Sequence, residues 1–276
     1  MFNSPHSGRV YPAEFLASAR LSRAALRKSE DCYVDELFEA CVDFGAPMLR
    51  VHTPRSYIDL NREPYELDPR MFAGVLPGYV NTASPRVAGG LGTIPRVVAE
   101  GEDIYRSRLN FADALTRIET TYRPYHRTLT ALVDEVVRNT GSVLLVDCHS
   151  MPSSAASHIV PALAQGADAV LGDRFGVSCG EAVSSFVEGL LRAEGLKVSR
   201  NKPYAGGFIT HSHGAPTSGR HALQIEINRA LYMNETTLEK SPGFAPLQAA
   251  LRRMTAKLLG GLDQLLAPPP RQLAAE

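Results

Sequence analysis

The chain has 276 residues, with 29 basic and 29 acidic side chains, so its formal net charge at neutral pH is zero. Hydrophobic residues make up 44% and charged residues 21%, which is ordinary for a globular protein and excludes disorder along the whole length. A dedicated nucleic-acid binder is not expected, because no basic excess exists to neutralise phosphates, and no apolar run approaches the roughly 20 residues of a membrane span.

The N-terminus and the cysteines indicate the cellular compartment. The first residues, MFNSPHSGRV, lack the apolar region of a signal peptide. The four cysteines are scattered without a CxxC pair, which fits neither a disulfide framework nor a cysteine-type zinc site. We therefore expect a cytoplasmic protein with reduced thiols.

Candidate strands and helices alternate along the first half of the chain. Residues 48–51 form a short candidate strand. Residues 111–139 carry apolar side chains at three- and four-residue spacing, which predicts a long helix that Pro124 kinks or divides. The apolar run 143–146 predicts a strand that is buried on both faces.

The same alternation continues in the second half. Residues 181–193 and 247–265 have the apolar stripe of helices. Strict alternation in residues 222–228 predicts a strand with apolar side chains on one face and polar side chains, Glu226 among them, on the other. These patterns favour an α/β layered architecture, and since no linker or composition break divides the chain, we expect one domain over residues 1–276.

The stretch 64–95 is rich in glycine and proline and has little periodicity. It is long for a plain connection inside a compact domain. Two interpretations fit it, a loop that covers a functional site and a long ordered surface loop.

Two histidines are candidate metal ligands. His149 follows the predicted strand 143–146, and the carboxyl edge of a parallel sheet is where ligands bind. Its neighbour Asp147 could orient the imidazole of a zinc ligand, although a hydrogen-bonded strand-end histidine fits equally well. His6 lies in the turn SPHSG, where flexible backbone permits close approach to an ion.

Three acidic residues could take part in such a site. Asp31 and Asp35 are four residues apart and are expected to share a helix face, which is ordinarily a solvated acidic face but could supply one metal ligand. Glu226 lies between apolar neighbours in its strand, and a buried carboxylate is costly unless it is paired, protonated or bound to a metal. A raised pKa would suit a general base, whereas an ion pair with Arg229 is the alternative.

Two further segments could bind a substrate. The Arg62 guanidinium, with Asn61 beside it, could hold a carboxylate in two hydrogen bonds, and a surface pair with Glu63 is the alternative. Residues 206–214 (GGFITHSHG) combine glycines with two histidines. They could chelate a metal if the segment is extended, or form a glycine-hinged loop that shapes a pocket.

Together these pieces resemble the N-formylglutamate amidohydrolase family. Seven segments occur in the family's order between residue 2 and about residue 235: SPHSGRVYPAEF, YVDEL, SYIDLNR, LLVDCHS, GDRFGVSC, NKPYAGGFIT and HALQIEINRALYM. The family is related to zinc carboxypeptidases and aspartoacylases. The resemblance therefore implies a three-layer α/β/α fold with a mixed sheet and one catalytic Zn²⁺, or another divalent metal.

The resemblance also implies roles for individual residues. The metal ligands would be His6, Asp35 and His149. Relatives carry a glutamate ligand three residues after the first histidine, where this chain has Arg9, so Asp31 and Glu14 are alternatives for the acidic ligand. Glu226 would activate water, and the substrate would contact Asn61, Arg62, Gly207, Thr210 and His213.

The implied reaction is hydrolysis of the formamide bond of N-formyl-L-glutamate to formate and L-glutamate, in histidine catabolism. The expected partner is a small N-acyl amino acid, and the sequence does not indicate the oligomeric state. Family members commonly have a His-Tyr pair where this chain has Ser212-His213. A zinc-dependent deacylase or peptidase for another N-acyl amino acid is therefore the alternative, and a non-catalytic binding protein on this scaffold is a less favoured one.

Overall fold

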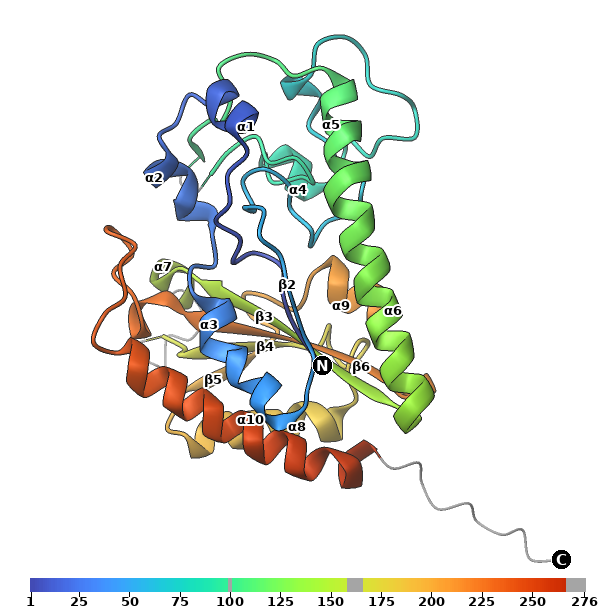
Figure 1. The fold of residues 1–276 in the computed structure, drawn as a ribbon, viewed down its shortest axis with the longest axis vertical. Helices are drawn as coiled ribbons and strands as arrows, with labels where there is room; N and C mark the ends of the chain where they lie inside the picture. Colours follow the sequence, from blue (N-terminus) through green and yellow to red (C-terminus); the bar gives the residue numbers. More distant parts are fainter. Residues whose placement is uncertain (99–100, 158–165, 267–276) are drawn as a thin grey trace, which may run out of the picture.

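Six strands form one mixed sheet in a computed structural model that describes residues 1–98, 101–157 and 166–266 (Figure 1). The order across the sheet is β2-β1-β3-β6-β4-β5. Strands β2, β1, β3 and β6 are parallel, whereas β4 runs antiparallel to β6 and parallel to β5. The strands are β1 (Phe2–Ser4), β2 (Met48–Arg50), β3 (Val143–Met151), β4 (Ala169–Gly172), β5 (Val198–Arg200) and β6 (Arg220–Asn228).

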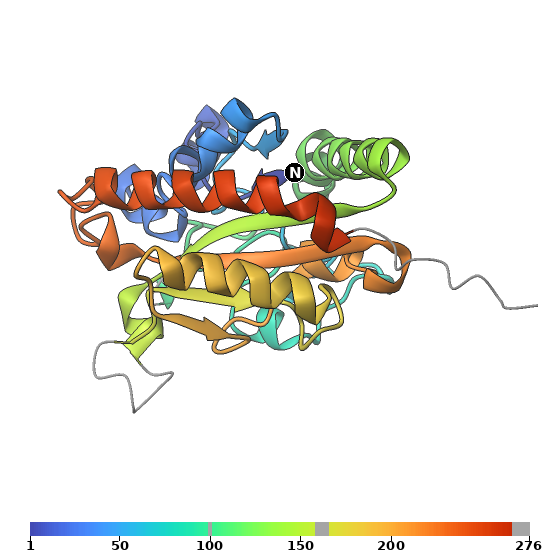
Figure 2. The same cartoon turned by 90° about the horizontal axis from the view of Figure 1, so that it is seen from below.

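Helices cover both faces of this sheet (Figures 1 and 2). One face packs against α3, α8 and α10, and α8 lies beside α10 in both views, whereas the other face packs against α6. The helices are α1 (Ala13–Ser18), α2 (Arg23–Leu26), α3 (Val34–Phe38), α4 (Pro85–Ala88), α5 (Phe111–Arg117), α6 (Arg123–Thr140), α7 (Ser153–Ser157), α8 (Glu181–Ala193), α9 (Phe208–His213) and α10 (Phe244–Leu266). This arrangement confirms the predicted α/β/α layers and mixed sheet.

The central strand β3 divides the hydrophobic core in two. Because successive side chains of a strand point to opposite faces, Leu144 and Val146 pack with α3, α8 and α10. Val143 and Leu145 pack on the opposite face with Leu129 of α6. Every residue of β3 is buried, as expected for a strand inside a layered α/β protein.

The predicted helix 111–139 is interrupted as its proline suggested. Helix α5 ends at Arg117, a π-helical turn spans Ile118–Tyr122, and α6 begins at Arg123. Pro124 lies in the first turn of α6, where its missing N–H removes no helical hydrogen bond. The backbone thus returns from a π-helical to an α-helical hydrogen-bond pattern immediately before the proline.

Other boundaries differ from the sequence-based ones. Strand β3 continues to Met151, so His149 lies within the strand and not after it. The strand includes the polar residues of its second half because β6 pairs with β3 along all nine of its residues. The short strands β1, β4 and β5 were not predicted, since three or four residues are too few to display a period.

The stretch 64–95 is ordered and contains α4 and a short 3-10 helix, Pro69–Met71. Leu67 and Phe72 are buried in the same core as α6. Within the described part of the chain, no helix is long and apolar enough to cross a membrane.

The core of β3 supplies a first test of this packing. Leu145 is fully buried, so Leu145→Ala should lower the free energy of unfolding by about 2–5 kcal/mol in urea denaturation. Val75 is 99% exposed, and Val75→Ala should stay within about 0.5 kcal/mol of the parent chain. Equal effects of the two substitutions would contradict the core assignment.

Candidate active site

The candidate site lies where β1, β3 and β6 end. A cavity of about 1060 Å³ opens there, and its wall includes His6, His149, Glu226 and Arg62. His6 lies just after β1, His149 lies in β3 and Glu226 lies in β6. These three parallel strands are neighbours, and their carboxyl ends meet at one edge of the sheet. The stretch 64–95 adds Arg86, Leu91 and Pro95 to the wall.

A cluster of two histidines and one aspartate is buried at this edge. One ligand atom from each of His6, Asp31 and His149 lies within 4.8 Å of the others. Asp31 Oδ2 is 3.0 Å from His149 Nδ1 and 3.4 Å from His6 Nδ1. The three side chains therefore converge through two nitrogens and one carboxylate oxygen.

A second carboxylate lies beside the far nitrogen of each imidazole. His6 Nε2 lies 2.7 Å from Asp59 Oδ1, and His149 Nε2 lies 3.0 Å from Asp147 Oδ2. Such partners fix the ring orientation and leave Nδ1 of each ring facing the cluster. His6 Nδ1 is buried without a hydrogen-bond partner among the described residues. An unpartnered imidazole nitrogen beside another imidazole and a carboxylate is a donor set that fits a divalent ion such as zinc.

A chain of buried hydrogen bonds extends from this cluster to α6. The Tyr125 hydroxyl donates to Asn3 Oδ1 over 2.6 Å, and Asn3 Nδ2 donates to Asp147 Oδ1 over 2.8 Å. Asp147 in turn lies against His149. One face of the sheet is thus connected to a candidate ligand through polar groups from α6, β1 and β3.

Asp31 is held as a carboxylate by a guanidinium on its other side. Arg229 Nη2 donates to Asp31 Oδ1 over 2.9 Å, and Arg229 Nε donates to Ser150 Oγ over 3.1 Å. Burial favours the neutral carboxyl, but a hydrogen bond from His149 and the charges of both histidines hold the pKa of Asp31 well below its usual range. Asp31 therefore presents an ionised oxygen to both histidines.

Asp31, and not Asp35, is the acidic residue of the buried cluster. Asp35 lies on α3, and its carboxylate accepts hydrogen bonds from Arg9 Nη2 at 3.1 and 3.2 Å. Asp31 instead precedes the helix and joins the histidines. Glu14, the other alternative, is exposed on α1.

Glu226 lies directly beside His149 in the paired strands. The register of β3 and β6 matches these two residues, and strands are spaced about 4.8 Å apart. Gln224 Nε2 donates to Glu226 Oε1 over 2.8 Å. Burial raises the pKa of Glu226 to about 7, and the charge of Asp31 acts in the same direction. The alternative ion pair with Arg229 is wrong, since Arg229 pairs with Asp31.

Asn61 and Arg62 lie on the wall of the cavity, and the alternative of a surface pair with Glu63 is wrong because Arg62 is buried. Arg62 Nε donates to Leu91 O over 2.8 Å, and Arg62 Nη1 donates to Asn61 O over 2.8 Å. Asn61 Oδ1 accepts from the Ile209 N–H over 2.8 Å, and its Nδ2 is 3.3 Å from His149 Nε2. Arg62 Nη2 also lies 3.5 Å from the buried Asp59 Oδ2, so the pair is anchored, and this long contact leaves Arg62 donor capacity for an anion.

The glycine-rich segment rules out the chelating interpretation, whereas Gly206 and Gly207 line the cavity as expected for a loop that shapes a pocket. Residues 208–213 form α9, so His211 and His213, two positions apart on a helix, do not face one side. Gly207 lines the cavity, but His213 is not among its described lining residues. Thr210 is also absent from that described lining, and its hydroxyl donates to Gly207 O over 3.0 Å at the start of α9.

Sequence reasoning assigned no role to Asp59, although it lies in the motif that contains Asn61 and Arg62. Its carboxylate contacts His6 and also accepts a hydrogen bond of 3.0 Å from Arg55 Nε. Burial opposes ionisation, but the charges of Arg55 and Arg62 hold the pKa of Asp59 well below its usual range. The sequence offered one hint, since Asp59 lies three residues before Arg62. That spacing indicates a role only once His6 is known to lie beside Asp59.

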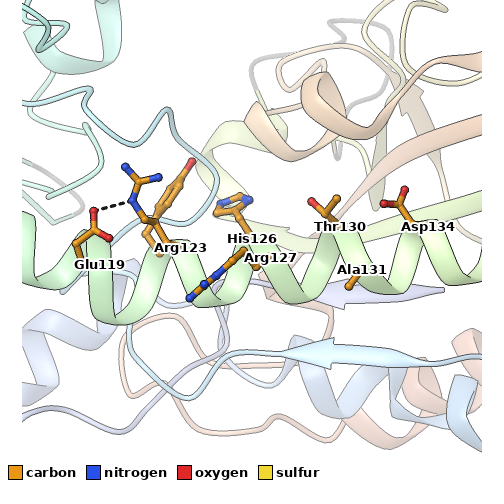
Figure 3. A pocket seen from close by; sticks show the side chains of 8 residues that line it. Glu119, Arg123, His126, Arg127, Thr130, Ala131 and Asp134 are labelled. Carbon is orange, nitrogen blue, oxygen red and sulfur yellow. Dashed lines mark hydrogen bonds and ion pairs between the residues drawn. The ribbon is translucent and has the colours of Figure 1, made fainter.

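A second hollow of about 620 Å³ follows the exposed side of α6 and the turn before it (Figure 3). Its side chains point from consecutive helical turns, and Arg123 pairs with Glu119 over 2.6 Å. Among its described lining residues, only His126 is an imidazole, and its Nε2 already contacts Leu60 O at 2.9 Å. The hollow lacks the convergent donors of the cavity at the sheet edge.

A buried glutamate beside a His–Asp–His cluster, in a cavity with an available guanidinium, is the arrangement of a hydrolase for a small anionic molecule. Residues 1–233 match the family of N-formylglutamate amidohydrolases. The chain belongs to this family. It is thus related to enzymes that hydrolyse amides.

Individual relatives agree with this assignment. The chain is 27% identical to an N-formylglutamate deformylase of Pseudomonas putida over 94% of this chain and 91% of that protein. It is 28% identical to an N-formylglutamate deformylase of Pseudomonas aeruginosa over 85% of this chain and 82% of that one. The crystal structure of an N-formylglutamate amidohydrolase from Ralstonia eutropha superposes with a TM-score of 0.88 at 36% identity, covering 95% and 94% of the two chains.

The contact between Gly207 and Asn61 supplies a test of the site's packing. A Cβ at position 207 would lie 2.3 Å from Asn61 Nδ2, so Gly207→Ala should displace Asn61 and cost about 1–3 kcal/mol of unfolding free energy. Gly78 has open space around it, and Gly78→Ala is the matched control for urea denaturation. If Gly207→Ala unfolds at the same urea concentration as the control, this close packing is wrong.

Proposed function

We propose that the chain hydrolyses the formamide bond of N-formyl-L-glutamate to formate and L-glutamate, with a divalent metal, zinc, as cofactor. The observation that carries this proposal is the register that sets the buried Glu226 beside His149 of the His–Asp–His cluster. The names of the relatives support the substrate. The reaction class follows from a base and a metal-type donor set in one cavity.

His6, Asp31 and His149 are the residues that would hold the metal. Two imidazole nitrogens and one carboxylate oxygen are a common set for catalytic zinc, which leaves a coordination position for water or substrate. When bound there, zinc lowers the pKa of water and polarises the amide carbonyl. Asp59 and Asp147 would keep the imidazoles oriented for that role.

Glu226 would act as the general base and then as the acid. Its carboxylate takes the proton of the attacking water and delivers it to the leaving amine of glutamate. Burial raises its pKa to about 7, which makes it a stronger base than a solvated carboxylate. A cation held by the adjacent cluster would lower that pKa again, so that the group is ionised at neutral pH.

Arg62 would bind one carboxylate of the substrate. The side chain is 9% exposed and reaches the cavity, and Leu91 O and Asn61 O hold it in place. A carboxylate fixed by this guanidinium would set the formyl carbon next to the cluster, and such positioning accelerates a reaction only when the geometry is tight. Asn61 and Gly207 complete that part of the wall.

The proposed domain organisation is supported by the cavity wall, and the proposed compartment and pathway by the resemblance. We assign the chain to one catalytic domain in which the stretch 64–95 covers the site, since that stretch contributes Arg86, Leu91 and Pro95 to the wall. A cytoplasmic enzyme of histidine catabolism follows from the resemblance alone. The Ser212-His213 departure loses weight as an argument for another substrate, because neither residue is among the described lining residues of the cavity.

The direct experiment measures metal content and formate release together. The purified chain should contain zinc, release formate from N-formyl-L-glutamate and lose this activity when a chelator removes the metal. Substrates with acetyl or peptidyl groups in place of formyl should react more slowly. A chain that binds zinc but prefers one of these substrates would favour the alternative deacylase, and a chain with neither zinc nor turnover would favour a binding protein.

Removing the base tests the catalytic role. Glu226→Gln should lower kcat by about 10²–10⁴-fold, because the amide cannot accept the proton of water. Zinc content should be unchanged, since Glu226 is not in the donor set. Glu239 is exposed near the same end of the chain, and Glu239→Gln is the control for loss of one carboxylate. Retained turnover in Glu226→Gln would remove Glu226 from this role.

A pair of matched variants tests the acidic ligand. Asp31→Asn should weaken zinc binding by more than about 100-fold, measured by competition with a chromogenic chelator. Asp35→Asn should leave zinc binding nearly unchanged, because the Asp35 carboxylate faces Arg9. The reverse order of affinities would restore Asp35 as the ligand.

A further inference from the structure

The cavity contains more positive side chains than the carboxylate clamp requires. Five cationic residues line it: Lys28, Arg55, Arg62, Arg86 and Arg229. N-formylglutamate carries two carboxylates, one next to the formamide and one at the end of the side chain. If Arg62 binds one of them, the structure leaves a second carboxylate to be matched. A second carboxylate site presupposes the proposed function.

Two of these cations are already committed to buried carboxylates. Arg55 Nε is 3.0 Å from Asp59 Oδ2, and Arg229 Nη2 is 2.9 Å from Asp31 Oδ1. Both acceptors are almost completely buried, so separating either pair would leave an unpaired buried charge. Neither guanidinium is therefore free to follow a substrate.

The other two cations have loose partners at the rim. Lys28 Nζ is 3.7 Å from Glu102 Oε2, and Arg86 Nη1 is 3.8 Å from Glu66 Oε2. The Arg86 side chain is 41% exposed, and the Glu66 oxygen that faces it is buried without a hydrogen-bond partner among the described residues. At that separation Arg86 keeps its hydrogen-bond donors available.

Arg86 and Arg62 share one wall of the cavity. The Leu91 N–H donates to Arg86 O over 2.8 Å, and Leu91 O accepts from Arg62 Nε over 2.8 Å. One residue thus ties the backbone of α4 to the guanidinium of Arg62. Burial lowers the pKa of Arg62, and the positive charge of Arg86 acts in the same direction. Lys28 instead lies beside Arg229, whose Nη1 donates to Lys28 O over 3.2 Å.

We infer that Arg86 binds the second carboxylate of the substrate and so makes the site selective for a dicarboxylic N-acyl amino acid. The guanidinium can stay 3.8 Å from the buried Glu66 and present its other donors to the carboxylate, so no buried charge loses its partner. Arg62 and Arg86 then hold the two ends of one small dianion. No bond forms or breaks in this step, and Arg86 acts on specificity alone.

A comparison of two substrates tests this role. N-formyl-L-glutamine has the shape of N-formyl-L-glutamate but no side-chain charge. The parent chain should prefer the glutamate compound in kcat/KM, and Arg86→Ala should lower this preference by about 10–100-fold, through KM, since a hydrogen bond to a charged group contributes about 1.5–3 kcal/mol. Turnover of the glutamine compound should be unchanged, and Arg86→Lys should restore part of the preference.

Lys28→Ala is the control, since it removes the other loosely paired cation of the rim. It should keep the preference for the charged substrate. If Arg86→Ala lowers kcat/KM equally for both compounds, Arg86 only supports the wall and the inference is wrong. If Lys28→Ala abolishes the preference instead, the second carboxylate lies on the other wall.

Calorimetry separates this inference from the proposed function. Binding of both compounds is measured on Glu226→Gln protein and on the same protein with Arg86→Ala. A glutamate-selective loss of affinity in the double variant would support the subsite even if the parent chain released no formate, in which case the proposed reaction alone would fail. Equal affinities of the two proteins for N-formyl-L-glutamate would overturn the subsite even if formate is released.

Discussion

The burial of ionised groups at one edge of the sheet is the constraint on which this structure depends. A charge removed from water is costly unless it is paired and hydrogen-bonded. Asp31 and Asp59 meet this requirement through Arg229 and Arg55, and Asp147 meets it through Asn3 and His149. The Asp31–Arg229 and Asn3–Asp147 contacts join residues that are far apart in sequence, so they form only when β1, β3 and β6 are aligned as they are.

The same edge gives two carboxylates opposite acid–base properties. Asp31 faces a guanidinium and two imidazoles, and its pKa is held well below the usual range. Glu226 lies beside His149 and accepts a hydrogen bond from Gln224, and burial raises its pKa to about 7. Neighbouring groups whose environments move their pKa values apart divide naturally into a permanently ionised group and a proton carrier. This division follows from the partners of each group and not from residue type.

The sequence predicted the parts of the molecule that repeat a pattern over many residues. Strand β6 and helix α8 followed from their periods, and the polar face of β6 placed Glu226 correctly. The acidic residue of the cluster did not follow, because Asp31 and Asp35 were assigned to one helix face. In the structure α3 begins only at Val34, after Tyr33 with a left-handed φ of 65°. That break turns Asp31 toward the histidines and leaves Asp35 to Arg9, and no periodicity reports it.

A neutral chain can still build a site for an anion, because net charge is a sum over the whole surface. The cavity wall carries Arg62 and Arg86, which are linked through Leu91, and the nearest carboxylates, Asp59 and Glu66, lie 3.5 and 3.8 Å from these guanidinium groups. Like charges held side by side repel each other until an anion lies between them. The energetic benefit of filling this cavity therefore grows with the charge of the ligand, and a dicarboxylate satisfies both guanidinium groups where a monocarboxylate leaves one unmatched.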